Sequence, residues 1–150
     1  MRKDKSICEI EGWEWNDDVP DKNSSHVEYR FYKLHDKPIN SLGLDDVRFL
    51  IIQNSGLDLL VTIALEKLKK NLFIEVEYYP GDLFMSLLQI NDESNYWNNN
   101  TDNKNKLIKL YTDQKKNMKK IGMDKENVKM INKFYKAFVE GETIDPLDFL

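Results

Sequence analysis

The sequence predicts an all-α fold, a single-domain bundle of about six helices that covers residues 1–150. Three observations favour this fold class. Apolar residues recur at spacings of three and four, residues typical of helix starts and stops bound most of these stretches, and strand patterns are scarce. Only residues 73–79 (FIEVEYY) alternate like a strand, and they have no partner strand in the chain. We also expect an irregular N-terminal segment over residues 1–23 and an acidic C-terminal tail over residues 142–150.

The first predicted helix follows Ser24 and Ser25, either of which can cap its N-terminus. It ends before Pro38, because the residue that precedes a proline avoids the α region. Its apolar face is predicted to consist of Val27, Phe31 and Leu34.

Two further helices are predicted within residues 41–71. The first begins at Asp45 or Asp46, which place negative charge at the positive end of the helix dipole. Gly56 is expected to stop it in the left-handed conformation. The second helix has its predicted buried positions at Leu57, Leu60, Val61, Ala64, Leu65 and Leu68.

The stretch EVEYYPGDLF, residues 75–84, leads into the next predicted helix. Pro80 is placed at the first helical position, where its missing N–H does no harm, and Asp82 is expected to cap the N-terminal amides. Arg48, on the helix before Gly56, is expected to form a half-buried ion pair with an acid such as Asp82 or Glu66. We interpret the following residues as a structural motif: Arg48, Tyr79, Pro80, Gly81 and Asp82.

The remaining chain predicts two more helices. Residues 91–106 are rich in asparagine and are typical of a loop or a weak helix start. A basic amphipathic helix follows and stops at Gly122, and a last helix runs from Asp124 to Gly141.

Charge is distributed unevenly along the chain. Residues 1–103 carry 11 Lys and Arg against 19 Asp and Glu, whereas residues 104–136 carry 11 Lys against 3 acids. The lysine-rich helix at 104–120 is a candidate for a nucleic-acid-associated regulator. A solvated helix face is the simpler interpretation, because the chain is acidic overall, with a formal charge of −4, and only Tyr111 lies among the lysines.

The sequence predicts no catalytic residue, metal ligand or cofactor. It has none of the common phosphate-binding, nucleophile or zinc motifs, and both His26 and His35 are expected at the surface. The rival hypothesis is a small helical enzyme that uses Glu75, Glu77 or Asp82 beside Tyr79. A single cysteine, with no membrane span or secretory signal, predicts a cytoplasmic protein.

An ordered series of short motifs over residues 7–97 resembles the CdiI family, the immunity proteins of bacterial contact-dependent growth inhibition. The matching positions are Lys37-Pro38-Ile39, Asp46-Val47-Arg48, Gln53, Gly56-Leu57, Ala64-Leu65-Glu66, Asn71-Leu72, Tyr79-Pro80-Gly81-Asp82-Leu83 and Trp97. Two departures stand out: Leu72 occupies a position where the pattern has proline, and the lysine-rich region after residue 103 lies outside the pattern.

The resemblance implies a small, non-enzymatic cytoplasmic protein that neutralises the C-terminal toxin domain of a cognate CdiA effector. Such toxins are often nucleases with basic grooves, which an acidic inhibitor complements. The expected partner is therefore a protein, with no direct contact to nucleic acid or membrane. The candidate toxin-binding residues are Glu75, Glu77, Tyr78, Asp17 and Asp18.

Overall fold

The computed structural model describes residues 3–12, 19–21, 23–91 and 94–141, and these residues confirm the predicted all-α class. The described part contains no strand, and two isolated bridges are its only β-type pairings. None of its helices is long and apolar enough to cross a membrane. The elements, in order, are α1 (Ile7–Glu11), α2 (His26–Asp36), the 3-10 helix η1 (Ile39–Ser41), α3 (Leu44–Ile52), α4 (Leu57–Lys70), α5 (Asp82–Leu88), α6 (Tyr96–Asn99), α7 (Thr101–Gln114), α8 (Asn117–Lys120) and α9 (Lys125–Glu140).

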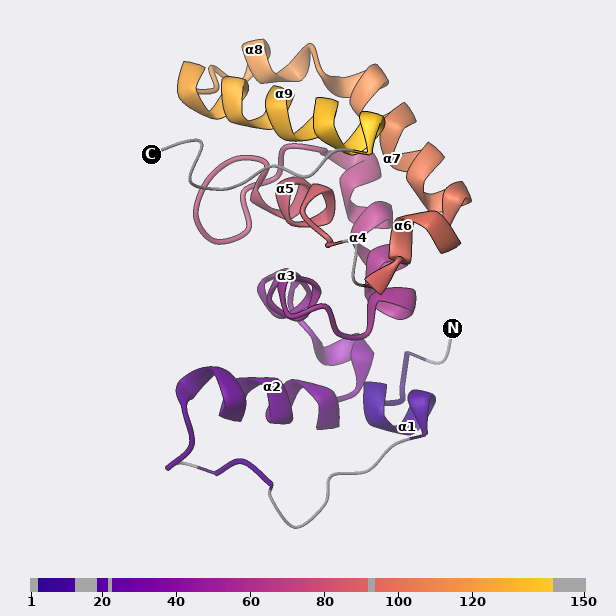
Figure 1. Cartoon of the computed structure of the whole chain (residues 1–150). Helices are drawn as coiled ribbons and strands as arrows, with labels where there is room; N and C mark the ends of the chain where they lie inside the picture. Colours follow the sequence, from indigo (N-terminus) through magenta and orange to yellow (C-terminus); the bar gives the residue numbers. More distant parts are fainter. Residues whose placement is uncertain (1–2, 13–18, 22, 92–93, 142–150) are drawn as a thin grey trace.

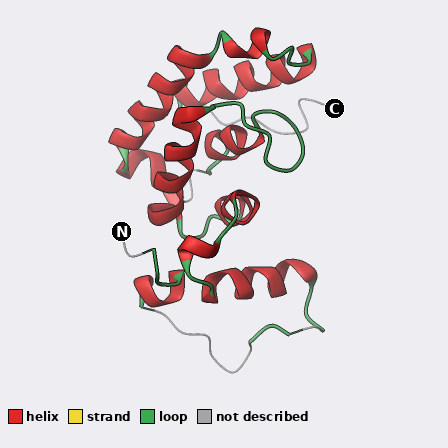
Figure 2. Cartoon of the chain, turned by 180° about the vertical axis from the view of Figure 1, so that it is seen from behind, coloured by secondary structure: helices red, strands yellow, loops and turns green. Residues whose placement is uncertain are grey.

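The helices are arranged along one long direction. Helices α1 and α2 lie together at one end, and α7, α8 and α9 lie at the other (Figure 1). Between them, α3 packs on α4 and α5, while α4 contacts α7 and α5 contacts α9. Figure 2 shows the same order from behind.

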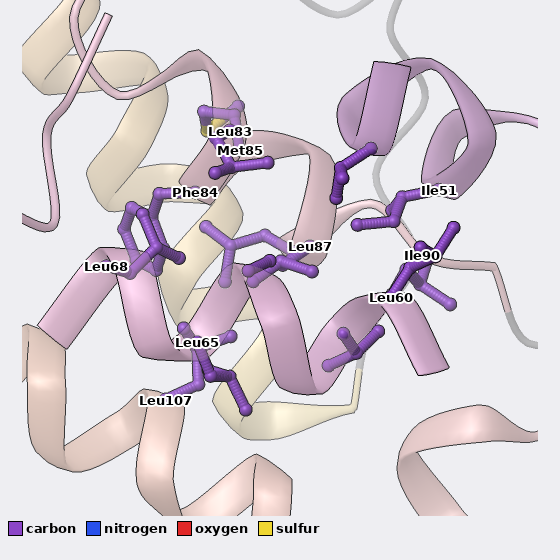
Figure 3. Close-up of a cluster of buried hydrophobic side chains, with 14 of the residues drawn as sticks. Ile51, Leu60, Leu65, Leu68, Leu83, Phe84, Met85, Leu87, Ile90 and Leu107 are labelled. Carbon is purple, nitrogen blue, oxygen red and sulfur yellow. The ribbon is translucent and has the colours of Figure 1, made fainter. Parts of the chain in front are cut away.

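Helix α5 is the centre of the core. All of its residues from Asp82 to Leu88 are buried, because α3, α4 and α9 pack around it. Figure 3 shows side chains of α5 gathered with those of α3, α4 and α7 in one apolar cluster. The pattern predicted for α4 is confirmed at every position, since the structure buries Leu57, Leu60, Val61, Ala64, Leu65 and Leu68.

The prediction of an irregular segment over residues 1–23 is wrong at α1. Ser6 caps this short helix by accepting a hydrogen bond from the Glu9 N–H at 3.2 Å. The Ser6 N–H in turn donates to Glu9 Oε1 at 3.3 Å, which completes a capping box. The signal was therefore present in the sequence as a serine followed three residues later by a glutamate.

Gly56 adopts the predicted left-handed conformation, with φ of 65°, but it precedes α4 instead of ending α3. Helix α3 already ends at Ile52, with Gln53 as its C-cap. A Cβ on Gly56 would lie 3.1 Å from Ile7 Cδ1 and 3.3 Å from Leu60 Cδ1. The glycine therefore allows α1 to approach the start of α4.

The single basic helix predicted before Gly122 is divided in the structure. Helix α7 ends at Gln114 and α8 begins at Asn117. The predicted last helix is confirmed, since α9 begins after the Asp124 cap and ends at Gly141, whose φ is 74°.

The predicted apolar face of α2 is wrong at Val27, and the predicted surface position of His35 is wrong. Val27 is 48% exposed, whereas Leu34 and His35 are buried. The His35 ring lies 2.6 Å from the Phe31 carbonyl through Nδ1 and 2.6 Å from Ser55 Oγ through Nε2. The helix thus turns a polar ring inward because both of its nitrogens find partners there.

We expect stability to decrease in mild acid because of His35. Burial lowers the pKa of His35 below 6.5, and it outweighs the Phe31 hydrogen bond and the attraction of Glu11, which raise the pKa. The unfolded chain therefore takes up a proton before the folded chain does. The free energy of unfolding should decrease as pH falls below about 6.5, by up to about 1.4 kcal/mol per pH unit, until the folded-state pKa is reached.

Urea unfolding across this pH range measures the effect. The matched control is His26→Gln, since His26 is exposed and its replacement should preserve the slope. His35→Gln should flatten the slope. An unchanged slope in the His35 variant would contradict this account.

Candidate functional site

The loop between α4 and α5 is built around the carboxylate of Asp82. This side chain is fully buried. Its Oδ1 accepts a hydrogen bond from the Val76 N–H at 2.8 Å, and its Oδ2 accepts from the N–H groups of Glu77 at 2.8 Å and Tyr78 at 2.9 Å. Three successive backbone amides thus converge on one carboxylate and fix the course of the loop.

This arrangement corrects the predicted role of Asp82 as a cap of its own helix. Asp82 is the first residue of α5, and the N-cap is Gly81, which makes no side-chain hydrogen bond. Pro80 accordingly lies outside the helix instead of at its first position. The carboxylate points back toward the loop, because the amides of residues 76–78 are presented to it there.

Gly81 closes the loop. Its N–H donates to the Ile74 carbonyl at 3.2 Å, and Glu75 and Pro80 form an isolated antiparallel bridge beside it. Its φ of 89° lies in the left-handed region, and a Cβ there would lie 3.1 Å from Ile131 Cδ1 of α9. Glycine is therefore required both by the turn and by the close approach of α9.

Arg48 of α3 is the charged partner of Asp82, as the sequence suggested. Its Nε lies 3.9 Å from Asp82 Oδ2 and 3.5 Å from the Asp82 carbonyl oxygen. The other acid considered, Glu66, instead lies 3.9 Å from Lys3 Nζ. Burial alone would raise the pKa of Asp82, but the three amides and Arg48 outweigh it, so that the pKa lies below the usual value.

Tyr78 lies over Arg48 on the outside of the loop. The Arg48 Cζ is 5.1 Å from the centroid of the Tyr78 ring, a cation–π arrangement. Tyr78 is nevertheless 70% exposed, the largest exposed fraction among the large apolar and aromatic side chains of the described residues. An aromatic ring is thus held in place on its inner side and open to solvent on its outer side.

A second arginine, Arg30 of α2, joins the loop to the start of α3. Its Nη2 lies 3.3 Å from Asp46 Oδ1 and 3.9 Å from Glu77 Oε1. It also lies 3.9 Å from Asp45 Oδ2, while its Cζ is 4.2 Å from the centroid of the Phe49 ring. Sequence reasoning missed Arg30, because its partners lie far away along the chain and no local spacing signals them.

Three of the five predicted toxin-binding residues lie on one loop of the described structure. Glu75, Glu77 and Tyr78 all lie on the loop before α5. Glu75 is exposed, and the side chain of Glu77 is 22% exposed beside Arg30. Asp17 and Asp18 lie outside the described residues.

The same geometry removes the support for the enzyme hypothesis. Asp82 is occupied by backbone amides, Glu77 faces Arg30 and Glu75 faces solvent, so the three carboxylates do not converge on a cleft. A polar cavity of about 410 Å³ lies elsewhere, between the end of α1, the start of α4 and α6, with Glu11, Asp58 and Tyr96 among its lining residues. Among the described residues, no group of three or more His, Cys, Asp or Glu side chains could hold a metal ion.

We expect Asp82→Ala to lower the free energy of unfolding by about 3–5 kcal/mol, since it removes one partner of a buried charged pair together with the acceptor of three amides. Urea unfolding at neutral pH measures this. Asp45→Ala is the matched control, because its side chain is 54% exposed and its loss should cost at most about 1 kcal/mol.

The Asp82 contribution should also depend on pH. Because its folded-state pKa lies below the unfolded value of 3.8, the stabilisation is present above about pH 4 and is lost as pH falls through the folded-state pKa. The difference between wild type and Asp82→Asn should therefore shrink in strong acid. A loss in Asp82→Ala no larger than in Asp45→Ala would overturn the assignment of Asp82 as the anchor of the loop.

A comparison with known protein families places the chain among them. The family model of contact-dependent growth inhibition (CDI) immunity proteins matches residues 9–107, which include the loop, Arg30, Arg48 and Asp82. No curated protein and no solved structure shows a significant match. The match covers well over half of the chain, and this chain therefore belongs to the family of CDI immunity proteins.

Proposed function

We propose that this chain binds and neutralises the C-terminal toxin domain of a cognate CdiA effector, without catalysing a reaction itself. The observation that carries the proposal is the family match over residues 9–107. The site agrees with such a role, because its carboxylates are used to hold the loop or face outward and are not gathered around a reacting centre.

The loop that carries Glu75, Glu77 and Tyr78 is our proposed toxin-binding surface. Tyrosine and arginine are the residues most often found at the energetic centre of protein interfaces, and here Tyr78 is exposed directly above Arg48. The loop is held by its backbone, so little conformational entropy is lost when a partner binds. Asp17 and Asp18 remain further candidates for toxin binding.

We propose a nuclease as the neutralised toxin, acting in the cytoplasm. The support is electrostatic, since residues 1–103 carry 11 basic against 19 acidic side chains. A nuclease needs a basic surface to hold phosphates, and an acidic inhibitor meets such a surface with complementary charge, which speeds association.

Neutralisation itself is tested by co-expression. Cells that produce the toxin domain encoded immediately upstream should grow when this chain is also produced and should stop growing without it. A parallel culture that produces the Asp82→Ala variant reports whether a folded loop is needed. Continued growth arrest with the wild-type chain, under conditions in which the two proteins are both present, would exclude the proposed function.

The proposed surface is tested by the affinity for the purified toxin domain. Tyr78→Ala should weaken binding by about 2 kcal/mol, or roughly 30-fold. The free energy of unfolding should fall by no more than about 0.5–1 kcal/mol, which is the contribution of the contact with Arg48. The double replacement Glu75→Gln and Glu77→Gln should mainly lower the association rate and its salt dependence.

Two variants of exposed residues outside the loop serve as controls for these measurements. Ile121 is 52% exposed on the segment after α8, and the Glu66 side chain is 65% exposed on α4. Ile121→Ala and Glu66→Gln should leave toxin affinity unchanged. Equal losses in the controls and in the loop variants would place the toxin contact elsewhere on the molecule.

A further inference from the structure

The end of the molecule formed by α7, α8 and α9 carries a dense set of exposed lysines. Of the 11 lysines in residues 104–136, all are exposed except Lys104, which is partly buried. We call this set of exposed lysines the basic end.

The lysines of α9 follow one face of the helix. Lys125, Lys129, Lys133 and Lys136 are spaced by four, four and three residues, so their side chains share a side. The opposite side of α9 is buried through Ile131, Phe134, Ala137 and Phe138. With a rise of 1.5 Å per residue, the stripe is about 17 Å long.

Packing against α7 holds this stripe in position. The rings of Tyr111 on α7 and Tyr135 on α9 stack with centroids 3.7 Å apart. The Tyr111 hydroxyl also donates a hydrogen bond to Asn132 Oδ1, and Lys104 Nζ lies 5.3 Å from the centroid of the Phe138 ring. The basic end is therefore a fixed surface supported by the core.

We propose that the basic end binds the phosphate backbone of a nucleic-acid duplex without reading its sequence. A duplex presents one negative charge per about 1.7 Å of its axis, so a stripe of this length faces several phosphates. This function is separate from toxin neutralisation, and the family match does not account for it, since the match ends at residue 107.

The lysines of the basic end favour nucleic acid over an acidic protein as its binding partner. Lysine is depleted in protein interfaces, whereas it is a common point-charge contact for phosphates. Residues 104–136 contain 11 lysines and no arginine, so their positive charges are flexible point charges and not the planar guanidinium fork typical of specific recognition.

The aromatic residues of this end favour a duplex over a single strand. Tyr111, Phe134 and Phe138 are buried and Tyr135 is partly buried, so none of these four rings is presented for an unpaired base to stack on. The overall acidity of the chain does not prevent binding, because charges more than about 8–10 Å apart are largely screened at physiological salt.

The proposal is tested by fluorescence anisotropy of a labelled DNA duplex and an RNA hairpin of about 20 base pairs with the full chain. If the four lysines of α9 contact phosphates, the affinity for the DNA duplex should fall about 150-fold between about 50 and 200 mM salt. Replacing Lys125, Lys129, Lys133 and Lys136 by glutamine should remove most of this salt dependence and weaken binding at the lower salt by about tenfold or more.

The matched control replaces four lysines at the α1–α2 end, at the other end of the molecule (Figure 1). Glutamine at Lys3, Lys5, Lys33 and Lys37 changes the net charge by the same amount and should leave duplex affinity unchanged. Urea unfolding of both quadruple variants confirms that each is folded.

Several results would overturn the proposal. The first is that the wild-type chain does not bind the duplex at about 25 mM salt. The second is that both quadruple variants lose the same amount of duplex affinity. The third is that the wild-type chain binds a single strand of equal length more tightly than the duplex. Loss of toxin affinity or of self-association in the α9 variant, with no duplex binding by the wild type, would assign the basic end to a protein partner. Toxin neutralisation measured in parallel separates this outcome from a failure of the proposed immunity function.

Discussion

One buried anion holds together helix α3, the loop before α5 and α5 itself. The carboxylate of Asp82 has no exposure to water, and it is stable there because three backbone amides and Arg48 replace the water it has lost. The removal of any one partner leaves a charge or a donor unsatisfied in the interior. Helix α3, the loop and α5 therefore depend on each other at a single point.

The position of α5 extends this dependence to the C-terminal helices. A helix of seven residues gains little from its own hydrogen bonds and owes its stability to the helices packed around it. One of these is α9, which begins beyond the residues matched by the family and meets the loop where Ile131 approaches Gly81. The core around residues 9–107, which the family model matches, is therefore completed by α9, which lies outside the matched residues.

The predictions from sequence were most accurate for buried helix positions and helix caps, which depend on residues close by in the chain. All six buried positions of α4 were predicted from helical spacing, and the serine cap of α2 was among the two proposed. The predictions failed where a distant residue decides. His35 contacts Ser55, 20 residues away, and Arg30 meets acids 15 to 47 residues away, and no local spacing indicates either contact. The predicted role of Asp82 failed at short range, because its carboxylate accepts from amides four to six residues before it and not from those of its own helix.

The hydrogen bonds from Asp82 hold the backbone of the loop and leave its side chains free of any structural role in these bonds. Asp82 binds the amides of residues 76–78, which every residue except proline possesses, and makes no demand on their side chains. The side chains at positions 75, 77 and 78 can therefore be exchanged while the loop keeps its course. If the loop is the toxin-binding surface proposed above, its recognition of a cognate toxin can change one residue at a time while the fold is kept.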